Sequence, residues 1–498
     1  MEKSKKNIFC IFLIINFIAW VCVQCLRNVI SIDAMEAISW GEVLDFGTNK
    51  HPPFSGWIIA GFYNLCGQHD IVAFILGQIF LLIGYIFIYK LAKFFLSEEK
   101  AICSSIILSS CYYYTYILFI DNFNCNFVSM ALWPMIAYYF YKATKEEKTI
   151  DWIIFGIASA IAVLTKYQVA FLFLALFLYL IFFERKQFKK KGMYISIICG
   201  FLIILPHIIW LFNNDFFSLT YMAERTEIGT HNTPEILVKI GRIFFPIKFT
   251  VDQILSVIPG IILYGFLALQ AGNISYVKDD ILKAEKWFII LITFAPMLAQ
   301  GSMAFFTDNR VQGIWGSIMV SFTGILMFTL FPIKFNKDTF KYFMKWAYSL
   351  VALWLVGMIV FSQLHTKRTL SYPYQSVMPY FNELWDKETN NAPLKYVGGH
   401  IDYVFQFHVY NERHPQAILE TFGHKNPWVD ETDVLKSGIL IVGGNEEDLA
   451  QRVRELTPLL PVSYKIIPKE YKFEVKNKLN KKKEFSFFYV IIPPMKND

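Results

Sequence analysis

Apolar runs of about 20 residues recur along the first three quarters of the chain and limit what it can fold into. A helix needs about 20 mainly apolar residues to cross a bilayer. The chain has 498 residues, of which 55% are hydrophobic and 18% aromatic. The runs predict approximate spans at 8–26, 71–89, 101–120, 125–141, 150–165, 167–183, 193–212, 251–270, 287–306, 311–332 and 345–364. We therefore expect a polytopic α-helical membrane protein with roughly 11–13 transmembrane helices.

Lysine and arginine are concentrated in alternate connections between these runs, which predicts the orientation. With a cytoplasmic N-terminus, basic segments such as 1–7, 90–100 and 184–192 face the cytoplasm, and the outside loops carry few Lys or Arg. The first run lacks a convincing small-residue cleavage site, which indicates a retained anchor. Most of the net charge of +7 then belongs to cytoplasmic loops, so the charge gives no indication of a nucleic-acid partner.

The hydrophobic pattern changes after about residue 372. Short runs typical of strands follow at 394–398, 438–443, 462–467 and 485–492, with a helical stretch near 445–456. We predict a transmembrane domain over 1–370 and a small soluble α/β domain over 371–498, on the outer side. The transmembrane domain has two large outside loops, at about 27–70 and 213–250. All eight cysteines precede residue 200, so neither a disulfide framework nor a zinc site is expected in the C-terminal domain.

The first outside loop opens with two carboxylates and an indole. On a helix, Asp33, Glu36 and Trp40 would share one face, because they are spaced i, i+3 and i+7. Carboxylates beside a bilayer are costly unless they are solvated or used. Two interpretations stay open: a solvated acidic loop, or a site in which Asp33 acts as a general base. In the second, Glu36 orients an acceptor or raises the pKa of its neighbour.

Other outside loops supply further candidates. Asp121 is a candidate second acid, with a helix N-cap as the alternative interpretation. Cations at the outer ends of spans could stabilise a departing phosphate, although snorkelling alone also explains such positions. These candidates are Lys50, His51, Lys166, Arg225 and Arg310. The arginines offer bidentate phosphate geometry. A role for a divalent metal ion is left open, and no cofactor is certain.

Some motifs are absent from the sequence. It contains no GxxxxGK[ST] motif, so nothing supports an ATP-driven pump. No Asp-x-Asp lies in a cytoplasmic soluble domain, as an enzyme using a nucleotide sugar and a divalent cation would show. The spans contain almost no charges, which argues against a lipid or sugar transporter without excluding one.

The outside loops also carry a family resemblance. Its main block comprises Asp33, Glu36, Trp40, Gly47, Lys50-His51-Pro52-Pro53 and Trp57. Weaker matches are Phe123-Asn124-Cys125-Asn126 with Trp133, Leu164-Thr165-Lys166-Tyr167, Pro206 to Leu211, Tyr221 to Arg225 and Pro393 to Gly399. Together they resemble the bacterial members of the dolichyl-phosphate-mannose protein mannosyltransferase superfamily. This is glycosyltransferase family 39 with its relatives, the aminoarabinose lipid A transferase and lipopolysaccharide sugar transferases. The resemblance covers nearly the whole chain, and only the first block is fairly specific.

The resemblance implies the GT-C fold and an inverting glycosyltransferase of the bacterial inner membrane, with Asp33 as base. It also implies a polyprenyl-phosphate-linked sugar donor and an outer-face acceptor, for which the Lys-His-Pro-Pro block favours lipid A or lipopolysaccharide core. Protein O-glycosylation is the alternative, and a non-catalytic lipid or sugar transporter is a second one. In two places the sequence departs from the family: Ala34 follows Asp33 where many members have Glu, and Lys50 replaces an acid before the His-Pro-Pro block. The second departure puts metal binding at that position in doubt.

Overall fold

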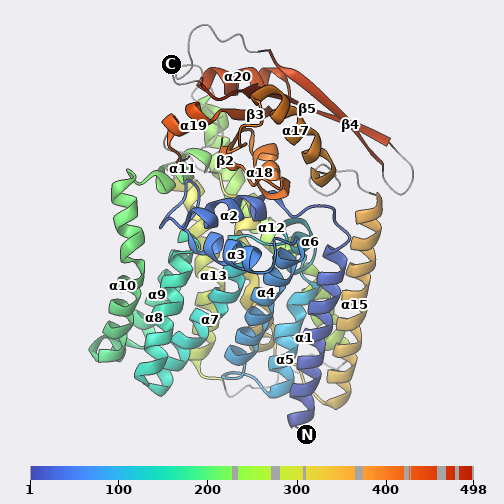
Figure 1. The fold of residues 1–498 in the computed structure, drawn as a ribbon. Coiled ribbons are helices and arrows are strands. Elements are labelled where there is room, and N and C mark those ends of the chain that lie inside the picture. The colour runs from blue at the N-terminus through green and yellow to red at the C-terminus, as the bar shows by residue number, and fades with distance from the viewer. Residues whose placement is uncertain are drawn as a thin grey trace.

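The computed structural model describes residues 2–226, 234–270, 281–306, 310–364, 374–419, 426, 428–456, 467–476 and 482–495. A bundle of long helices forms one part of the molecule, and a domain built on a β-sheet lies over one end of it (Figure 1). The N-terminus lies at the opposite end of the bundle (Figure 1). We call residues 374–495 the sheet domain.

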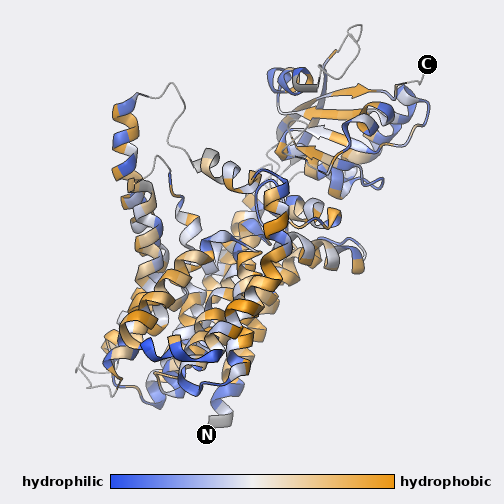
Figure 2. Cartoon of the chain, turned by 90° about the vertical axis from the view of Figure 1, so that its left-hand side faces the viewer, coloured by the Kyte–Doolittle hydropathy of each residue, from blue (hydrophilic) through white to orange (hydrophobic). Residues whose placement is uncertain are grey.

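Six described helices are long and apolar enough to cross a membrane. These spans are Ser4–Gln24, Ile71–Ala92, Lys191–Asn213, Glu235–Gln270, Lys283–Met303 and Lys337–Leu364. They lie in α1 (Glu2–Gln24), α4 (Ile71–Ala92), α10 (Lys191–Asn213), α12 (Glu235–Gln270), α13 (Lys283–Phe306) and α15 (Lys337–Leu364). Between them pack α7 (Cys125–Glu146), α8 (Thr149–Val163) and α9 (Ala170–Phe183). In Figure 2 the apolar residues line these helices, and the hydrophilic ones gather at both ends of the bundle. The predicted multi-pass helical architecture is confirmed.

Two of the predicted spans are not single straight helices. The run 101–120 is divided into α5 (Glu98–Ile106), two short 3₁₀ turns and α6 (Tyr116–Asp121), and its two halves meet at 80°. A serine-rich stretch precedes the bend, and the Ser110 hydroxyl donates to the Ile107 carbonyl at 2.6 Å, which competes with regular helix bonding. The run 311–332 consists of two 3₁₀ turns followed by α14 (Thr323–Leu330). The predicted number of spans therefore exceeds the six that the described residues supply by length and apolarity.

Both predicted outside loops contain helices. The first folds into α2 (Ile32–Val43) and α3 (Phe54–Leu65), joined by the segment 44–53. The second contains α11 (Phe217–Thr226), and α12 begins at Glu235 rather than near 251, so residues 235–250 belong to a spanning helix. Helices α2 and α3 cross at Gly41 and Gly56, where a Cβ on Gly41 would lie 2.0 Å from the Gly56 carbonyl oxygen. Glycine at this crossing lets the two backbones touch.

The sheet domain contains five described strands in the order β2-β1-β3-β5-β4. Their bounds are β1 Tyr396–Gly399, β2 Gln416–Leu419, β3 Ile439–Gly443, β4 Lys469–Lys476 and β5 Lys482–Ile492. The first three are parallel, with Tyr396 opposite Gln416 and Val397 opposite Leu440. The pairs β3–β5 and β4–β5 are antiparallel. Helices α17 (Tyr374–Thr389), α18 (Ile401–Tyr410), α19 (Glu431–Ser437) and α20 (Glu446–Leu456) complete the domain.

The predicted α/β character of this domain is confirmed. Strands β2 and β4 were not predicted, because β2 has only four residues and β4 is rich in lysine and glutamate. The predicted strand 462–467 lies outside the described residues, apart from its last position.

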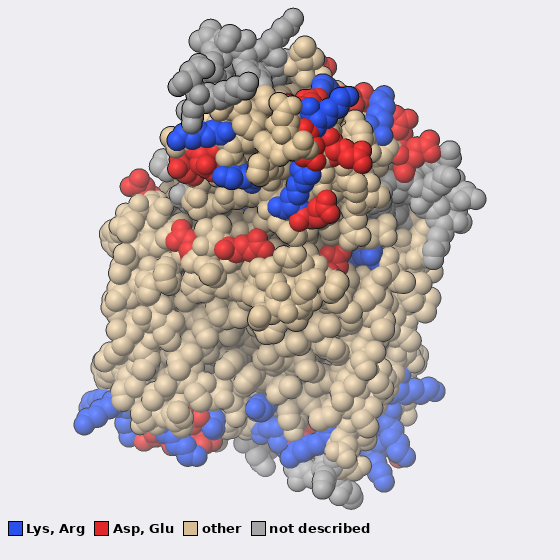
Figure 3. Space-filling view, in the orientation of Figure 1, with Lys and Arg blue, Asp and Glu red and all other residues tan. Residues whose placement is uncertain are grey.

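Charged residues form two belts on the molecule. Figure 3 shows Lys and Arg gathered at the end of the bundle that carries the N-terminus, and acidic residues with further cations at the other end. The surface between these belts is almost free of charge in this view (Figure 3). An uncharged band between two charged rims is what a membrane-spanning region requires.

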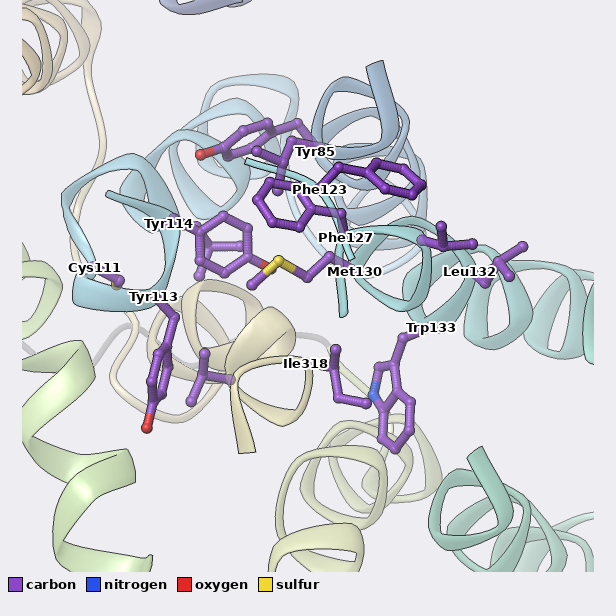
Figure 4. Packing of buried hydrophobic residues seen from close by; sticks show 14 of the residues in the cluster. Tyr85, Cys111, Tyr113, Tyr114, Phe123, Phe127, Met130, Leu132, Trp133 and Ile318 are labelled. Carbon is purple, nitrogen blue, oxygen red and sulfur yellow. The ribbon is translucent and has the colours of Figure 1, made fainter. Parts of the chain in front are cut away.

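Buried aromatic residues support the end of the bundle nearest the sheet domain. Phe123 and Phe127 stack with ring centroids 6.4 Å apart, and Figure 4 shows them beside Met130. Tyr85 and Tyr114 meet in the same cluster, 5.7 Å apart. Because Phe123 and Phe127 are both buried, they fix the segment between them, which begins helix α7.

Candidate active site

Helix α2 carries the two acids predicted from the sequence. The helix starts where the Ser31 side chain accepts a hydrogen bond from the Ala34 amide, which places Asp33 in the first turn. The Asp33 side chain is 46% exposed, whereas the side chain of Glu36 is only 2% exposed. Trp40 is buried as well. The two acids on this face therefore differ in access: Asp33 can meet a substrate and Glu36 is enclosed by protein.

Lys50 joins the three residues on this face of α2. Its ammonium nitrogen lies 2.7 Å from a Glu36 carboxylate oxygen, 3.8 Å from Asp33 and 5.9 Å from the centre of the Trp40 ring. Burial by itself would lower the pKa of Lys50, but the charges of Glu36 and Asp33 outweigh it and raise that pKa above its ordinary value. The lysine is therefore held in its charged form.

The segment that carries Lys50 is fixed by its own backbone. The Thr48 hydroxyl oxygen accepts hydrogen bonds from the amides of Lys50 and His51, at 3.2 and 2.9 Å, and donates to the His51 carbonyl. The His51 ring meets the Trp40 ring edge to face, with centroids 6.2 Å apart. His51 thus packs beside the site, and its predicted contact with phosphate remains a prediction.

Helix α10 holds the same segment from the other side. The Trp210 indole donates to the Asp45 carboxylate at 2.8 Å, and its ring covers Gly47, where a Cβ would lie 2.2 Å from a ring carbon. His207 is buried, with one ring nitrogen 2.8 Å from the Tyr167 hydroxyl and the other against the Phe46 carbonyl. His207 is therefore a packing residue with both ring nitrogens in contact with polar partners.

A second carboxylate approaches Asp33 through a shared amide. The Asn124 side-chain amide nitrogen lies 3.2 Å from a carboxylate oxygen of Asp33 and 3.3 Å from one of Asp121. Asn124 also caps helix α7, since its side-chain oxygen accepts from the Asn126 amide. The alternative interpretation of Asp121 as that N-cap is therefore wrong. Asp121 ends α6, where it lies close enough to Arg27 to interact with its charge.

Lys166 reaches the same neighbourhood from the turn between α8 and α9. It donates to the Asn126 side-chain oxygen at 2.7 Å. Burial lowers the pKa of Lys166, and the opposing charge of Asp33 offsets part of that effect. The structure therefore brings together Asp33, Glu36, Lys50, Asp121 and Lys166.

The remaining predicted residues are placed less completely. Arg225 lies on α11, but its side chain is outside what the structure describes. The same helix brings Tyr221 close enough to Lys50 to help raise the pKa of the lysine. Arg310 is exposed at the start of the segment leading into the first 3₁₀ turn after α13.

Three residues of the site had not been predicted. Asn124 and Asn126 appeared only as parts of a family block, and Arg27 only in the charge pattern of its loop. Sequence spacing offered no signal for them, because their roles depend on how α6 and α7 meet α2. Within the described ranges, no three His, Cys, Asp or Glu side chains converge to hold a metal ion, and the Lys50 ammonium fills the space beside Glu36.

Comparisons with known proteins agree with this architecture. Residues 50–210 match the family described as dolichyl-phosphate-mannose-protein mannosyltransferase. The lipid A galacturonosyltransferase RgtD of Rhizobium johnstonii is 22% identical over 304 residues, which cover 57% of this chain and 60% of that protein. Among solved structures, ArnT from Cupriavidus metallidurans, bound to undecaprenyl phosphate, aligns over 97% of both chains with a TM-score of 0.62 and 11% identity.

The chain is a multi-pass membrane protein with the GT-C fold, and its polar site lies at the end of the bundle beneath the sheet domain. The matched residues 50–210 include Lys50, Asp121 and Lys166. The predicted resemblance to the dolichyl-phosphate-mannose-protein mannosyltransferase family is confirmed over residues 50–210.

Proposed function

We propose that the chain is a glycosyltransferase that moves a sugar from a polyprenyl-phosphate carrier to an acceptor at the outer face of the bacterial inner membrane. The observation that carries the proposal is the arrangement of Asp33 and Lys50. A half-exposed carboxylate lies 3.8 Å from a largely enclosed, charged ammonium group, at the end of the helix bundle beneath the sheet domain. A base beside a cation is what transfer from a phosphate-linked donor requires.

In the proposed reaction, Asp33 removes a proton from the acceptor hydroxyl or phosphate as its oxygen attacks the anomeric carbon. The bond from that carbon to the carrier phosphate breaks, and the polyprenyl phosphate leaves with the bonding electrons. Attack opposite to the leaving group inverts the anomeric centre. Asp33 suits this step because its carboxylate is open to the substrate side while Asn124 fixes its orientation.

Lys50 and Lys166 both lie near enough to Asp33 to interact with its charge, and we assign them to the phosphate. Positive charge in a site poor in water stabilises a departing phosphate far more than it would in bulk water. Glu36 is too enclosed to touch an acceptor, so we assign it the role of holding Lys50 in place. No step passes through a metal ion, because the described residues around Asp33 do not form a set of metal ligands.

We propose lipid A or lipopolysaccharide core as the acceptor. The matched relative RgtD is named for transfer of galacturonate to lipid A, and the solved ArnT structure holds undecaprenyl phosphate. The ArnT structure supports a polyprenyl-phosphate carrier, and the name of RgtD supports a lipid A acceptor. Protein O-glycosylation by the same chemistry is the second candidate. It is favoured by the description of the matching family as protein mannosyltransferases.

The proposed orientation places the N-terminus in the cytoplasm and the sheet domain in the periplasm. The Lys- and Arg-rich belt at the N-terminal end of the bundle supports this orientation (Figure 3). Alkaline phosphatase fused after residue 370 should then be active, and a cytoplasmic reporter at that position should be silent. The reverse pattern would overturn both the orientation and the outer-face chemistry.

The donor class can be tested with purified protein in lipid vesicles. The protein is given either a set of polyprenyl-phosphate sugars or the matching nucleotide sugars, with lipid A as acceptor. We expect product only with the lipid-linked donors. Turnover with a nucleotide sugar alone, in the absence of polyprenyl carrier, would refute the proposed function. Mass spectrometry of lipid A, core and glycoproteins from a deletion strain would then separate the two acceptor candidates.

A further inference from the structure

Helix α18 of the sheet domain packs directly against α2, the helix that carries Asp33 and Glu36 (Figure 1). Two polar side chains of α18 make the connection. His408 Nε2 lies 3.1 Å from the carboxylate of Glu42, near the end of α2. The Tyr410 hydroxyl accepts a hydrogen bond from the Ile30 amide at 2.9 Å, just before the start of α2. The sheet domain thus holds α2 near both of its ends.

The spacing of these two residues explains how one short helix reaches both places. Successive side chains on an α-helix are rotated by about 100°, so residues two apart point in nearly opposite directions. Tyr410 and His408 therefore diverge, one toward the first residues of α2 and one toward Glu42. The His408 side chain is 7% exposed and that of Glu42 is 29% exposed, so the contact is enclosed on the side of the histidine.

Tyr410 is also tied to the membrane domain beneath α2. Its hydroxyl donates to the Asp70 carboxylate, with oxygen separations of 3.1 and 3.2 Å, and its ring stacks on Tyr374. The charge of Asp70 interacts with that of Arg27, whose guanidinium donates to the Ile120 carbonyl at 2.7 Å. The contact therefore extends to the residue that precedes Asp121.

The amide after Ile30 is held in a similar way. The Ser31 amide donates to the Asn122 side-chain oxygen at 2.6 Å. Two successive amides, separated from Asp33 by a single residue, are thus fixed by side chains from outside α2: Tyr410 from the sheet domain and Asn122 from the membrane domain. An isolated helix of 12 residues is marginal in water, so such contacts decide where α2 lies.

We propose that His408 and Tyr410 are positioning residues, through which the sheet domain sets the location of Asp33 and Glu36. The inference rests on the proposed function, because it assigns these acids to the transfer reaction. A displacement of about 1 Å in a reacting group can lower a rate by as much as about 100-fold. Loss of either contact should therefore reduce turnover more than donor binding, because Lys166 is held by Asn126 from outside α2.

The test uses the full-length protein in lipid nanodiscs, with Tyr410→Phe, His408→Ala and His408→Gln. Tyr396→Phe is the matched control, because it removes a tyrosine-to-carboxylate hydrogen bond of the same kind, to Asp433 at 2.6 Å, from the same domain but away from α2. We expect kcat to fall roughly 10-fold or more in Tyr410→Phe and His408→Ala, with the donor KM changed by less than about threefold. His408→Gln, which keeps a donor that can reach Glu42, should recover most of the loss, and Tyr396→Phe should keep wild-type kcat.

Hydrogen exchange of residues 30–43 gives a second readout that does not need activity. The Ile30 amide loses its partner in Tyr410→Phe, so exchange in this stretch should accelerate about 10-fold or more there and stay unchanged in Tyr396→Phe. Unchanged exchange or unchanged kcat in Tyr410→Phe and His408→Ala would overturn the inference. If the wild-type protein transfers no sugar from any polyprenyl donor, the proposed function fails instead, and the exchange experiment still decides whether the sheet domain holds α2.

Discussion

Replacing Lys50 alone should lower the free energy of unfolding more than replacing Lys50 and Glu36 together. In Lys50→Met the Glu36 carboxylate keeps its charge and its burial but loses the ammonium 2.7 Å away. Breaking a buried ion pair by deleting one partner costs about 3–5 kcal/mol, whereas replacing both partners with groups of similar volume is often neutral. Glu36 is 2% exposed and Lys50 13% exposed, so solvent can screen very little of this interaction.

The expected order of stability follows from these magnitudes. Lys50→Met should lose about 3–5 kcal/mol of unfolding free energy. Glu36→Gln should lose about 1–3 kcal/mol, because Lys50 keeps Asp33 at 3.8 Å and the glutamine keeps a hydrogen-bond acceptor. The double variant Glu36→Gln, Lys50→Met should lose only about 1 kcal/mol, because both partners are replaced together, so the coupling energy should be about 3 kcal/mol or more. Unfolding in mixed micelles, followed by tryptophan fluorescence against the mole fraction of denaturing detergent, measures all three.

Activity should follow a different order from stability. Both variants that lack Lys50 should lose transfer by about 10²–10³-fold, because a charge that stabilises the leaving phosphate is gone. Glu36→Gln should retain more activity than either of them. A double variant as unstable as Lys50→Met would refute the buried pair, and wild-type turnover in Lys50→Met would refute the assignment of Lys50 to the phosphate.

Three further predictions concern other parts of the site and its surroundings. Asp33→Asn should lower turnover by about 10²–10⁴-fold without reducing the amount of protein in the membrane, and near-normal lipid modification in cells carrying it would remove Asp33 from the mechanism. Burial raises the pKa of Asp70 to about 6 in the folded protein, so the stability that its protonated form contributes is present at low pH and is lost as the pH rises through 6. The melting temperature of Asp70→Asn relative to wild type should therefore increase between pH 4 and 6 and level off above pH 6. A difference that stays constant with pH would contradict this prediction. Gly47→Ala should weaken the packing of Trp210 on the segment 44–53, and it should lower both the melting temperature and the turnover. A variant with wild-type values in both assays would show that the segment can shift without consequence.

The sequence was sufficient for those parts of the site that depend on local periodicity. The spacing of Asp33, Glu36 and Trp40 predicted a common face, and in the structure all three lie against Lys50. The apolar runs likewise predicted the long spanning helices, because a bilayer demands a long apolar stretch wherever a helix crosses it. The catalytic and phosphate-binding roles assigned to these residues remain predictions.

The parts that depend on tertiary packing could not be predicted. Asn124 is an ordinary helix cap by sequence, and only the meeting of α6, α7 and α2 places its amide between Asp33 and Asp121. The bend after α5 was missed because hydropathy reports how apolar a segment is and not whether serine hydroxyls divert its backbone bonds. The contact of α18 with α2 joins residues about 370 positions apart, and no local pattern indicates such a pairing.

The backbone contact at Gly41 and Gly56 couples the position of α2, which carries the two acids, to that of α3. With no side chains between them at this crossing, α2 and α3 are packed so closely that they should move together. On α3, Phe62 and Leu65 are exposed, and at the edge of a bilayer such apolar side chains dip into the lipid. A shift of α3 in the lipid would therefore also move α2 and the two acids that it carries.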